Sequence, residues 1–126
     1  MPSRKIEDLV KDLQDAWRVA LVAYVTTYPD QPQPFITCTY RSPEEQLELY
    51  AIGRTKPGTI VTQLKSGSKH NTNPSRAFDI AFQKDGKLVW DKKHFIRFAA
   101  VIKSINPAVE WGGDWKKFKD CPHFQI

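Results

Sequence analysis

The feature that most restricts the fold is the segment 77–83, in which large apolar side chains alternate with small or charged ones. A period of two is typical of a β-strand, because successive side chains point to opposite faces of a sheet. One face would carry Phe78, Ile80 and Phe82, and the other would carry Asp79 between two alanines. An ionised carboxylate in such a strand is costly unless a cation or a metal neutralises it. The segment therefore predicts a sheet with one apolar face and one charged face, and an ordinary ion pair to a Lys or Arg explains Asp79 as well as a metal does.

The remaining pattern predicts three helices around that sheet. Apolar residues at three- and four-residue steps predict a helix over 6–24. Ser42-Pro43 with Glu45 predicts the start of a second helix, which ends near Gly53, and Asp91 is expected to cap a third helix, which ends before Asn106. Strands are expected at 35–40, 59–63, 77–83, 88–90, 109–111 and 123–125. Helices that flank a small, mainly antiparallel sheet predict an α+β fold. The length of 126 residues fits one domain, 1–126.

Charge is distributed unevenly between the two halves of the chain. Residues 1–60 carry a net charge of −1 and residues 61–126 carry +6. This difference suggests either an anionic partner (nucleic acid, a membrane surface or an acidic wall polymer) or a solvated lysine-rich face.

No apolar run approaches the roughly 18 residues of a transmembrane helix, and the first residues lack the apolar stretch of an export signal. Two cysteines, Cys38 and Cys121, are too few for a disulfide scaffold and leave buried thiols or one bridge open.

Two of the three histidines lie close to acidic residues in the sequence. His70 lies in a polar loop nine residues before Asp79, and His123 follows Asp120 by three residues. A hydrolytic zinc site needs three nitrogen or oxygen ligands and an open position for water. His70, Asp79 and His123 would supply those ligands, and Asp120 would suit a general base. The spacing leaves open which aspartate binds the metal, and it also allows Asp120 to be a turn residue.

Other residues have weaker signals. Arg41 lies between an expected strand and a helix start, where it could hold a substrate carboxylate or an oxyanion, or simply lie on the surface. Trp111 and Trp115 flank a Gly-Gly-Asp turn and are expected either beside the site or in the core. His94 is expected on the exposed or boundary side of its helix without a role. Cys38 lies within a strand, so a nucleophilic role for it is a weak alternative.

Four sequence blocks, in this order, resemble the peptidoglycan-cleaving zinc peptidases related to D-alanyl-D-alanine dipeptidases and carboxypeptidases. They are Tyr40-Arg41-Ser42, Ser68-Lys69-His70, Ala77-Phe78-Asp79, and Trp111-Gly112-Gly113-Asp114-Trp115 followed by Asp120-Cys121-Pro122-His123-Phe124. Within that group the chain looks most similar to the L-alanyl-D-glutamate endopeptidases found as phage endolysins. The blocks extend over roughly two thirds of the chain, from residue 40 to its last residues.

The resemblance implies roles for individual residues. It implies one zinc ion bound by His70, Asp79 and His123. It also implies that Asp120 is the catalytic base, that Arg41 contacts the substrate or the developing oxyanion, and that Ser68 contacts the substrate or supports the first ligand. The implied fold is α+β, with the metal on the face of a small antiparallel sheet.

One departure from the family pattern lies between the first two ligands. Eight residues separate His70 from Asp79, more than the family pattern has, and Ser75-Arg76 stand where that pattern has a glycine. We expect this longer loop to border the cleft and to affect substrate preference, with Arg76 as a second cationic contact to an acidic stem peptide.

The sequence thus predicts a monomeric zinc endopeptidase, an endolysin that hydrolyses the L-alanyl-D-glutamate bond of the peptidoglycan stem peptide. No nucleic acid partner and no stable membrane insertion are expected. Such an enzyme would stay in the cytoplasm until another factor released it to the cell wall. The alternatives are a D,D-carboxypeptidase or dipeptidase on the same scaffold, and a non-enzymatic module whose basic face binds wall polymer or nucleic acid.

Overall fold

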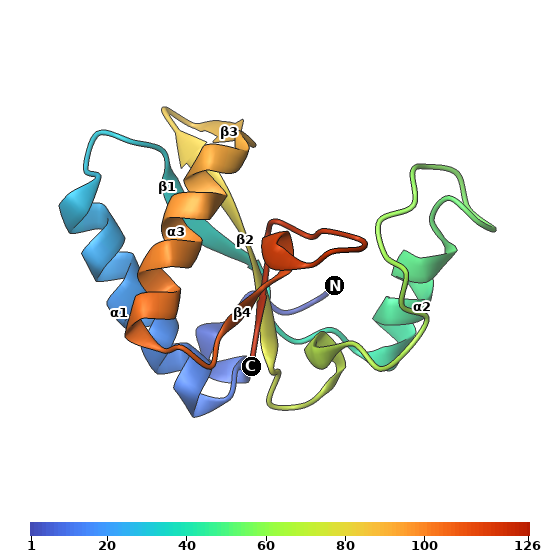
Figure 1. Ribbon diagram of the computed structural model, residues 1–126. Coiled ribbons are helices and arrows are strands. Elements are labelled where there is room, and N and C mark those ends of the chain that lie inside the picture. The colour runs from blue at the N-terminus through green and yellow to red at the C-terminus, as the bar shows by residue number, and fades with distance from the viewer.

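In the computed structural model, which describes residues 1–126, the chain is organised around a five-stranded antiparallel sheet (Figure 1). The strands are β1 Gln33–Cys38, β2 Ala77–Lys84, β3 Lys87–Val89, β4 Glu110–Trp111 and β5 His123–Gln125. Their order is β1-β2-β5-β4, and β3 pairs with the far end of β2. Because β2 has a partner on both edges, its two faces determine what each side of the sheet can do.

The helices are divided between the two sides of this sheet. They are α1 Lys11–Thr27, α2 Pro43–Ala51 and α3 Lys92–Ile105, with short 3-10 turns at Ile6–Asp8, Lys69–Asn71 and Gly112–Asp114. Figure 1 shows α1 and α3 side by side against the sheet, whereas α2 stands apart at the opposite end of the molecule. This arrangement confirms the predicted α+β fold. None of the helices has the length and apolar character needed to cross a membrane.

The core lies between the sheet and the α1–α3 layer. Phe78 of β2 packs edge-on against Trp17 of α1, with ring centroids 5.7 Å apart, and stacks on Phe124 of β5 at 5.4 Å. Phe98 of α3 packs edge-on against Phe124, with ring centroids 5.5 Å apart. Full burial of one such side chain stabilises the fold by about 1.5–3 kcal/mol, so this aromatic cluster anchors both helices to the sheet.

Local sequence explains where the helices begin. Ser42 accepts a hydrogen bond from the backbone N–H of Glu45, and the Glu45 side chain accepts one from Ser42, which completes the predicted capping box of α2. Asp91 caps α3 by accepting from the backbone N–H of Lys93. The first helix begins later than predicted: residues 6–8 form a separate 3-10 turn, and Leu9 forms a β-bridge with Ser75 before α1 starts.

Two predictions about secondary structure and burial are wrong. Residues 59–63 form no strand, because no other strand lies beside them, and their apolar side chains Ile60 and Val61 are exposed. His94 is not on the exposed side of α3: only 3% of it is exposed, and its ring lies 5.6 Å from that of Phe82. Phe82 and the neighbouring Phe95 extend the core far enough along α3 to cover it.

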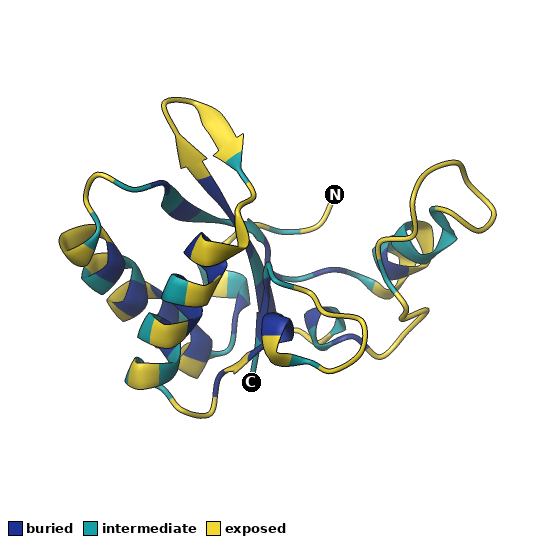
Figure 2. Cartoon of the chain, turned by 45° about the horizontal axis from the view of Figure 1, so that its top comes forward, coloured by how far each residue is buried: buried dark blue, intermediate teal, exposed yellow.

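Helix α2 and the loop that follows it, residues 43–67, form a thin arm in contrast to the rest of the molecule. Gln46 is its only fully buried helical residue, whereas α1 and α3 each bury five. Figure 2 shows this difference, with the following loop almost entirely exposed. The arm therefore contributes little to the core, and it forms one wall of a cleft beside the sheet.

Candidate active site

Strand pairing brings the candidate residues together on the face of β2 that points away from α1 and α3. Asp79 lies directly opposite His123 of β5 on one side and opposite Cys38 of β1 on the other. His70 approaches from the 3-10 turn Lys69–Asn71, where its backbone N–H donates to the Ser68 side chain. The rings of His70 and His123 are 5.1 Å apart. Residues that are far apart in the sequence thus meet around one carboxylate.

Hydrogen bonding fixes the orientation of the His70 ring. Its Nδ1 lies 2.7 Å from the backbone carbonyl oxygen of Thr39, which can only accept, so Nδ1 carries the proton. Nε2 is therefore the free nitrogen; it lies 3.3 Å from Asp79 Oδ1, is buried and has no hydrogen-bond partner. A buried ring nitrogen without a hydrogen-bond partner is unfavourable, and a metal ion at this point would satisfy it.

Asp79 lies between charged and polar groups on three sides. Its Oδ1 is 3.2 Å from His123 Nδ1, and its Oδ2 is 3.7 Å from an Arg41 guanidinium nitrogen. Burial alone would raise the pKa of Asp79, but His70 and then His123 outweigh it and hold that pKa well below its usual range. Burial likewise opposes the charged form of His70, yet the Asp79 carboxylate raises the pKa of His70 to about 10, so a proton competes with a metal ion for Nε2. Asp79 is therefore ionised, and cations or a metal are its natural partners.

The donor atoms have the composition of a zinc site. Two imidazole nitrogens, on His70 and His123, lie within 3.3 Å of the same carboxylate oxygen. Two imidazoles and one carboxylate are a ligand set that catalytic zinc uses. Cys38 is also close: its sulfur lies 3.7 Å from Nδ1 of His70, the nitrogen that donates to Thr39, and within 4.8 Å of a ligand atom of Asp79. Neither Cys38 nor Cys121 is in a disulfide.

Asp120 lies at the edge of this cluster and is partly open to solvent. Its Oδ2 is 4.0 Å from His123 Nδ1, and 48% of its side chain is exposed. Burial of the carboxyl group, and then the negative charge of Asp79, raises the pKa of Asp120 above its ordinary value. The backbone position is fixed by Gly112, whose carbonyl accepts from Asp120 N at 3.0 Å and whose missing Cβ would lie 2.2 Å from Asp120 O. Asp120 is thus held close to the cluster, and its carboxylate lies within 4.8 Å of ligand atoms of Asp79 and His123.

Arg41 lies in the site and not on the surface. Its Nη1 donates to Oε1 of Gln46 at 2.8 Å, and the Gln46 amide in turn donates to the carbonyl of Leu64. Its backbone N–H donates to the carbonyl of His70. A role for Gln46 in the site was not predicted from the sequence. It lies one helical turn after the capping residue Ser42, and its side chain points toward the site. It connects the arm to the site through Arg41.

The other predicted residues are divided between the site and the surrounding structure. Trp115 lies against His123, with ring centroids 5.2 Å apart, whereas Trp111 belongs to the core and donates to the carbonyl of Cys121. Ser68 is buried and lines the cleft. The prediction for Arg76 is wrong: its Nε donates to the carbonyl of Ile126, and none of residues 71–76 lines the cleft. That loop instead supports the site from behind, where Ser75 Oγ donates to carbonyl oxygens including that of Thr39.

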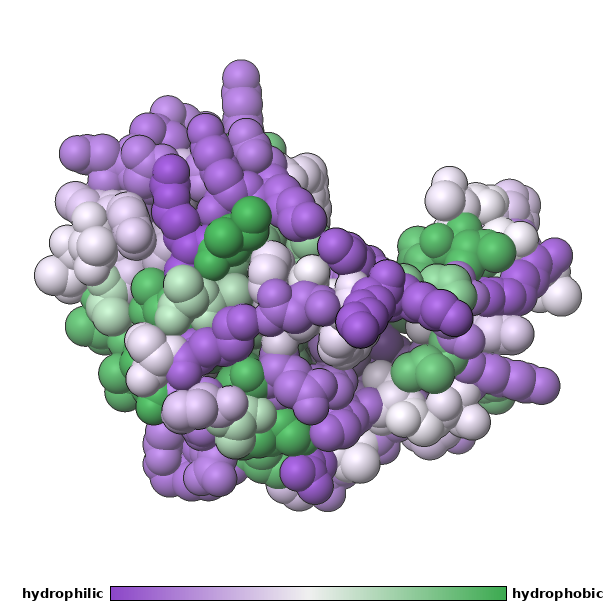
Figure 3. Space-filling view, in the orientation of Figure 1, coloured by the Kyte–Doolittle hydropathy of each residue, from purple (hydrophilic) through white to green (hydrophobic).

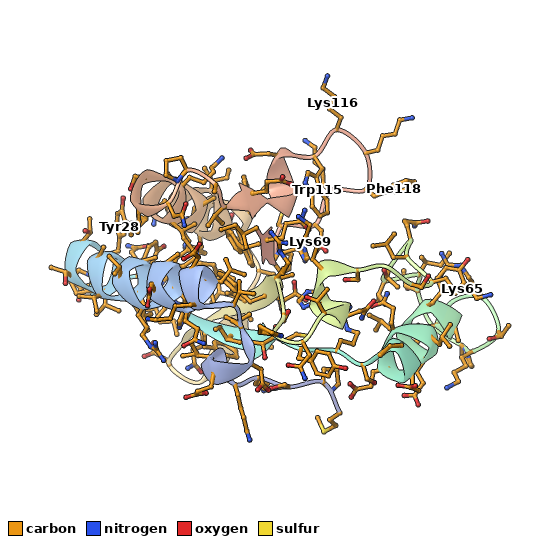
Figure 4. All side chains as sticks on the ribbon, turned by 90° about the horizontal axis from the view of Figure 1, so that it is seen from below. Tyr28, Lys65, Lys69, Trp115, Lys116 and Phe118 are labelled. Atoms are coloured by element: carbon orange, nitrogen blue, oxygen red, sulfur yellow. The ribbon has the colours of Figure 1, made fainter.

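A cleft of about 800 Å³ lies over this cluster. The arm supplies Leu49, Ile60 and Leu64 to one wall, and the loop after Gly112–Asp114 supplies Trp115 and Phe118 to the other. Figure 3 shows the hollow between the arm and the rest of the molecule. Figure 4 shows Trp115 and Phe118 on one loop, and Lys65 on the arm opposite that loop. This volume lies within the range of about 300–1,000 Å³ that is typical of ligand-binding clefts.

The sequence pattern of the D-alanyl-D-alanine carboxypeptidase family matches residues 62–126, which include every candidate ligand and Asp120. This chain is a member of that family. It is 42% identical over 101 residues to the peptidoglycan L-alanyl-D-glutamate endopeptidase CwlK of Bacillus subtilis (strain 168). That match covers 72% of this chain and 59% of CwlK, so the chain spans little more than half of the length of that relative.

A solved structure has the same fold as this family member. The L-Ala D-Glu endopeptidase ChiX of Serratia marcescens superposes with a TM-score of 0.76 at 24% sequence identity. The superposition covers 100% of this chain and 88% of ChiX. At this identity the likeness establishes the fold: the whole chain, including the arm, has a counterpart in the ChiX structure.

Proposed function

We propose that this protein is a zinc-dependent peptidoglycan endopeptidase that hydrolyses the L-alanyl-D-glutamate bond of the stem peptide. The observation that carries the proposal is the approach of the His70 and His123 rings to the same oxygen of Asp79 in a cleft of about 800 Å³, with Asp120 beside them. Family membership and the L-alanyl-D-glutamate endopeptidase activities of CwlK and ChiX support the same assignment.

The proposed metal ligands are His70 Nε2, Asp79 and His123 Nδ1, which would hold one zinc ion. When bound, zinc would act as a Lewis acid on the scissile carbonyl and lower the pKa of a water molecule. The chain's own contribution is rigidity: the Thr39 carbonyl fixes the His70 ring, and strand pairing fixes Asp79 opposite His123. The three donors are therefore held in position before the metal arrives.

Asp120 is the proposed general base. Its carboxylate lies at the mouth of the site, where Oδ2 can accept a proton from the attacking water and later donate it to the leaving amine nitrogen. A raised pKa suits this exchange, because the group must both take up and release a proton near neutral pH. Asp79 keeps a lowered pKa, so the two aspartates are suited to different tasks.

Arg41 and Ser68 are the proposed substrate contacts. Arg41 is held by Gln46 with its guanidinium close to Asp79, where it can stabilise an oxyanion or a substrate carboxylate. Ser68 lines the cleft next to His70. Both residues would act by orienting the peptide relative to Asp120.

The bond specificity is tested by digestion of purified peptidoglycan. We expect new amino termini on D-glutamate, detected by mass spectrometry of the released fragments. Release of free alanine from stem ends would instead identify a D-alanyl-D-alanine carboxypeptidase, the activity for which the family is named. A protein that binds peptidoglycan but releases nothing would be the non-enzymatic module.

The proposal extends to a role in lysis, in which a monomeric enzyme leaves the cytoplasm only when another factor opens the membrane. Expression with and without a membrane-permeabilising protein tests this role. We expect lysis only when both are present, and lysis by this protein alone would contradict it.

A further inference from the structure

Strand β5 carries a second polar side chain on the site face. Residues two apart in a strand share a face, so Gln125 points to the same side as His123 while Phe124 between them enters the core. Gln125 Oε1 lies 2.8 Å from His123 Nε2. An amide oxygen can only accept a hydrogen bond, so this contact requires a proton on Nε2.

Glu110 fixes the orientation of the Gln125 amide from the other side. The β4–β5 register places Glu110 opposite Gln125, and Gln125 Nε2 donates to Glu110 Oε2 at 3.1 Å. An ionised carboxylate has no proton to donate, so the NH2 group of Gln125 must face Glu110 and its oxygen must face His123. Rotation of the amide by 180° would place two acceptors together at Glu110 and two donors together at His123.

We propose that Gln125 is a positioning residue that, with Glu110, sets which nitrogen of His123 is available to a metal. The proposal rests on the metal site proposed above. A proton on Nε2 leaves the lone pair on Nδ1, the nitrogen that lies 3.2 Å from Asp79. Metal-binding histidines are commonly oriented in this way by an acceptor at the other ring nitrogen.

His70 has the same arrangement with the two nitrogens exchanged. Its Nδ1 donates to the carbonyl of Thr39, which leaves Nε2 free toward Asp79. One histidine is thus fixed by a backbone carbonyl and the other by a side-chain amide. Because only the amide can be changed by substitution, Gln125 is the point at which this positioning can be tested.

The test is zinc affinity, measured by competition with a chromophoric chelator. Gln125→Leu removes the acceptor, and we expect zinc to bind about 10- to 100-fold more weakly. The double variant Gln125→Glu with Glu110→Gln exchanges the carboxylate and the amide but keeps an acceptor at His123, so its affinity should return to within a few-fold of wild type. Gln83→Leu, an exposed glutamine of β2 that makes no contact with the site, is the matched control and should change nothing.

A second readout is the imidazole NMR spectrum of the zinc-loaded protein. We expect a slowly exchanging proton on Nε2 of His123 in the wild type and fast exchange in Gln125→Leu. Wild-type zinc affinity in Gln125→Leu, or an equally protected Nε2 proton in that variant, would overturn the inference. A wild-type protein that binds no zinc would instead refute the proposed metal site and is distinguishable from either result.

Discussion

The two faces of β2 consist of alternate residues of one strand, but different interactions stabilise the side chains on each face. One face carries Phe78, Ile80 and Phe82, which are fully buried beneath α1 and α3. The other carries Asp79, which is surrounded by imidazoles, a guanidinium and a second carboxylate. On the first face stability comes from the area removed from water, whereas on the second every group needs a specific polar partner.

The comparison indicates how the molecule separates stability from chemistry. The apolar face holds the strand rigid, and this rigidity allows charged groups on the opposite face to be held in fixed positions. Substitutions on the polar face should therefore change activity more than folding, and substitutions on the apolar face should do the reverse.

The largest expected effect is on the polar face. Asp120→Asn removes the proposed base while preserving shape, and we expect turnover of peptidoglycan to fall by about 10²- to 10⁴-fold. Zinc content and the free energy of unfolding should stay near wild-type values. Asp114→Asn is the control, because Asp114 pairs with Lys103 outside the cleft and should leave turnover unchanged. Substantial activity in Asp120→Asn would show that another group moves the proton.

The matching change on the apolar face is Phe78→Ala. It leaves a cavity between α1, β2 and β5, so the free energy of unfolding should fall by about 3–5 kcal/mol in urea denaturation. Molecules that remain folded should keep their turnover per bound zinc. A loss below about 1 kcal/mol would mean that this face contributes less to stability than its burial indicates.

Gly112→Ala tests how closely the position of Asp120 is controlled. The added Cβ would meet the backbone oxygen of Asp120 at 2.2 Å, so the segment that carries the base must shift. We expect turnover to fall on the order of 100-fold, with zinc still bound and a loss of stability of about 1–3 kcal/mol. Unchanged turnover would show that the base tolerates displacement.

The smallest effect concerns a titratable group on the apolar side. Burial, and then the positive charges of Arg97 and Lys93, lowers the pKa of His94. A histidine with a lowered pKa in the folded state contributes stability that is present above its unfolded pKa of about 6.5 and is lost as the pH falls through the folded value. His94→Leu should therefore flatten the decline of stability with acid, as measured by thermal unfolding at a series of pH values. An unaltered decline would assign the acid sensitivity to other groups.

Much of the apolar face could be predicted from the sequence, because its signals are local. The alternation in 77–83 and the capping residues Ser42 and Asp91 each depend on a few neighbouring positions. Residues 59–63 show the limit of such signals, since a β-branched run forms a strand only if another strand lies beside it. His94 shows a second limit, because its burial depends on how α3 lies over Phe82.

The functional residues of the polar face could be predicted mainly from the family resemblance. Spacing alone left open which aspartate binds a metal, since the answer depends on Asp79 lying opposite His123 across two strands. Gln46 and Gln125 have no sequence motif of their own, and their importance follows from contacts with Arg41 and His123. Gln125 could have been found from the strand period, which places it on the same face as His123.

Metal analysis of the wild type and of His70→Ala, Asp79→Ala and His123→Ala tests the central claim most directly. We expect one zinc per wild-type chain, loss of that zinc in each variant, and unchanged zinc content in Cys38→Ala, whose sulfur lies 3.7 Å from Nδ1 of His70, the nitrogen that donates to Thr39. Circular dichroism of each variant would establish that the fold is retained. Zinc that remains bound at full occupancy in folded His70→Ala or His123→Ala would contradict the claim that these side chains form the metal centre.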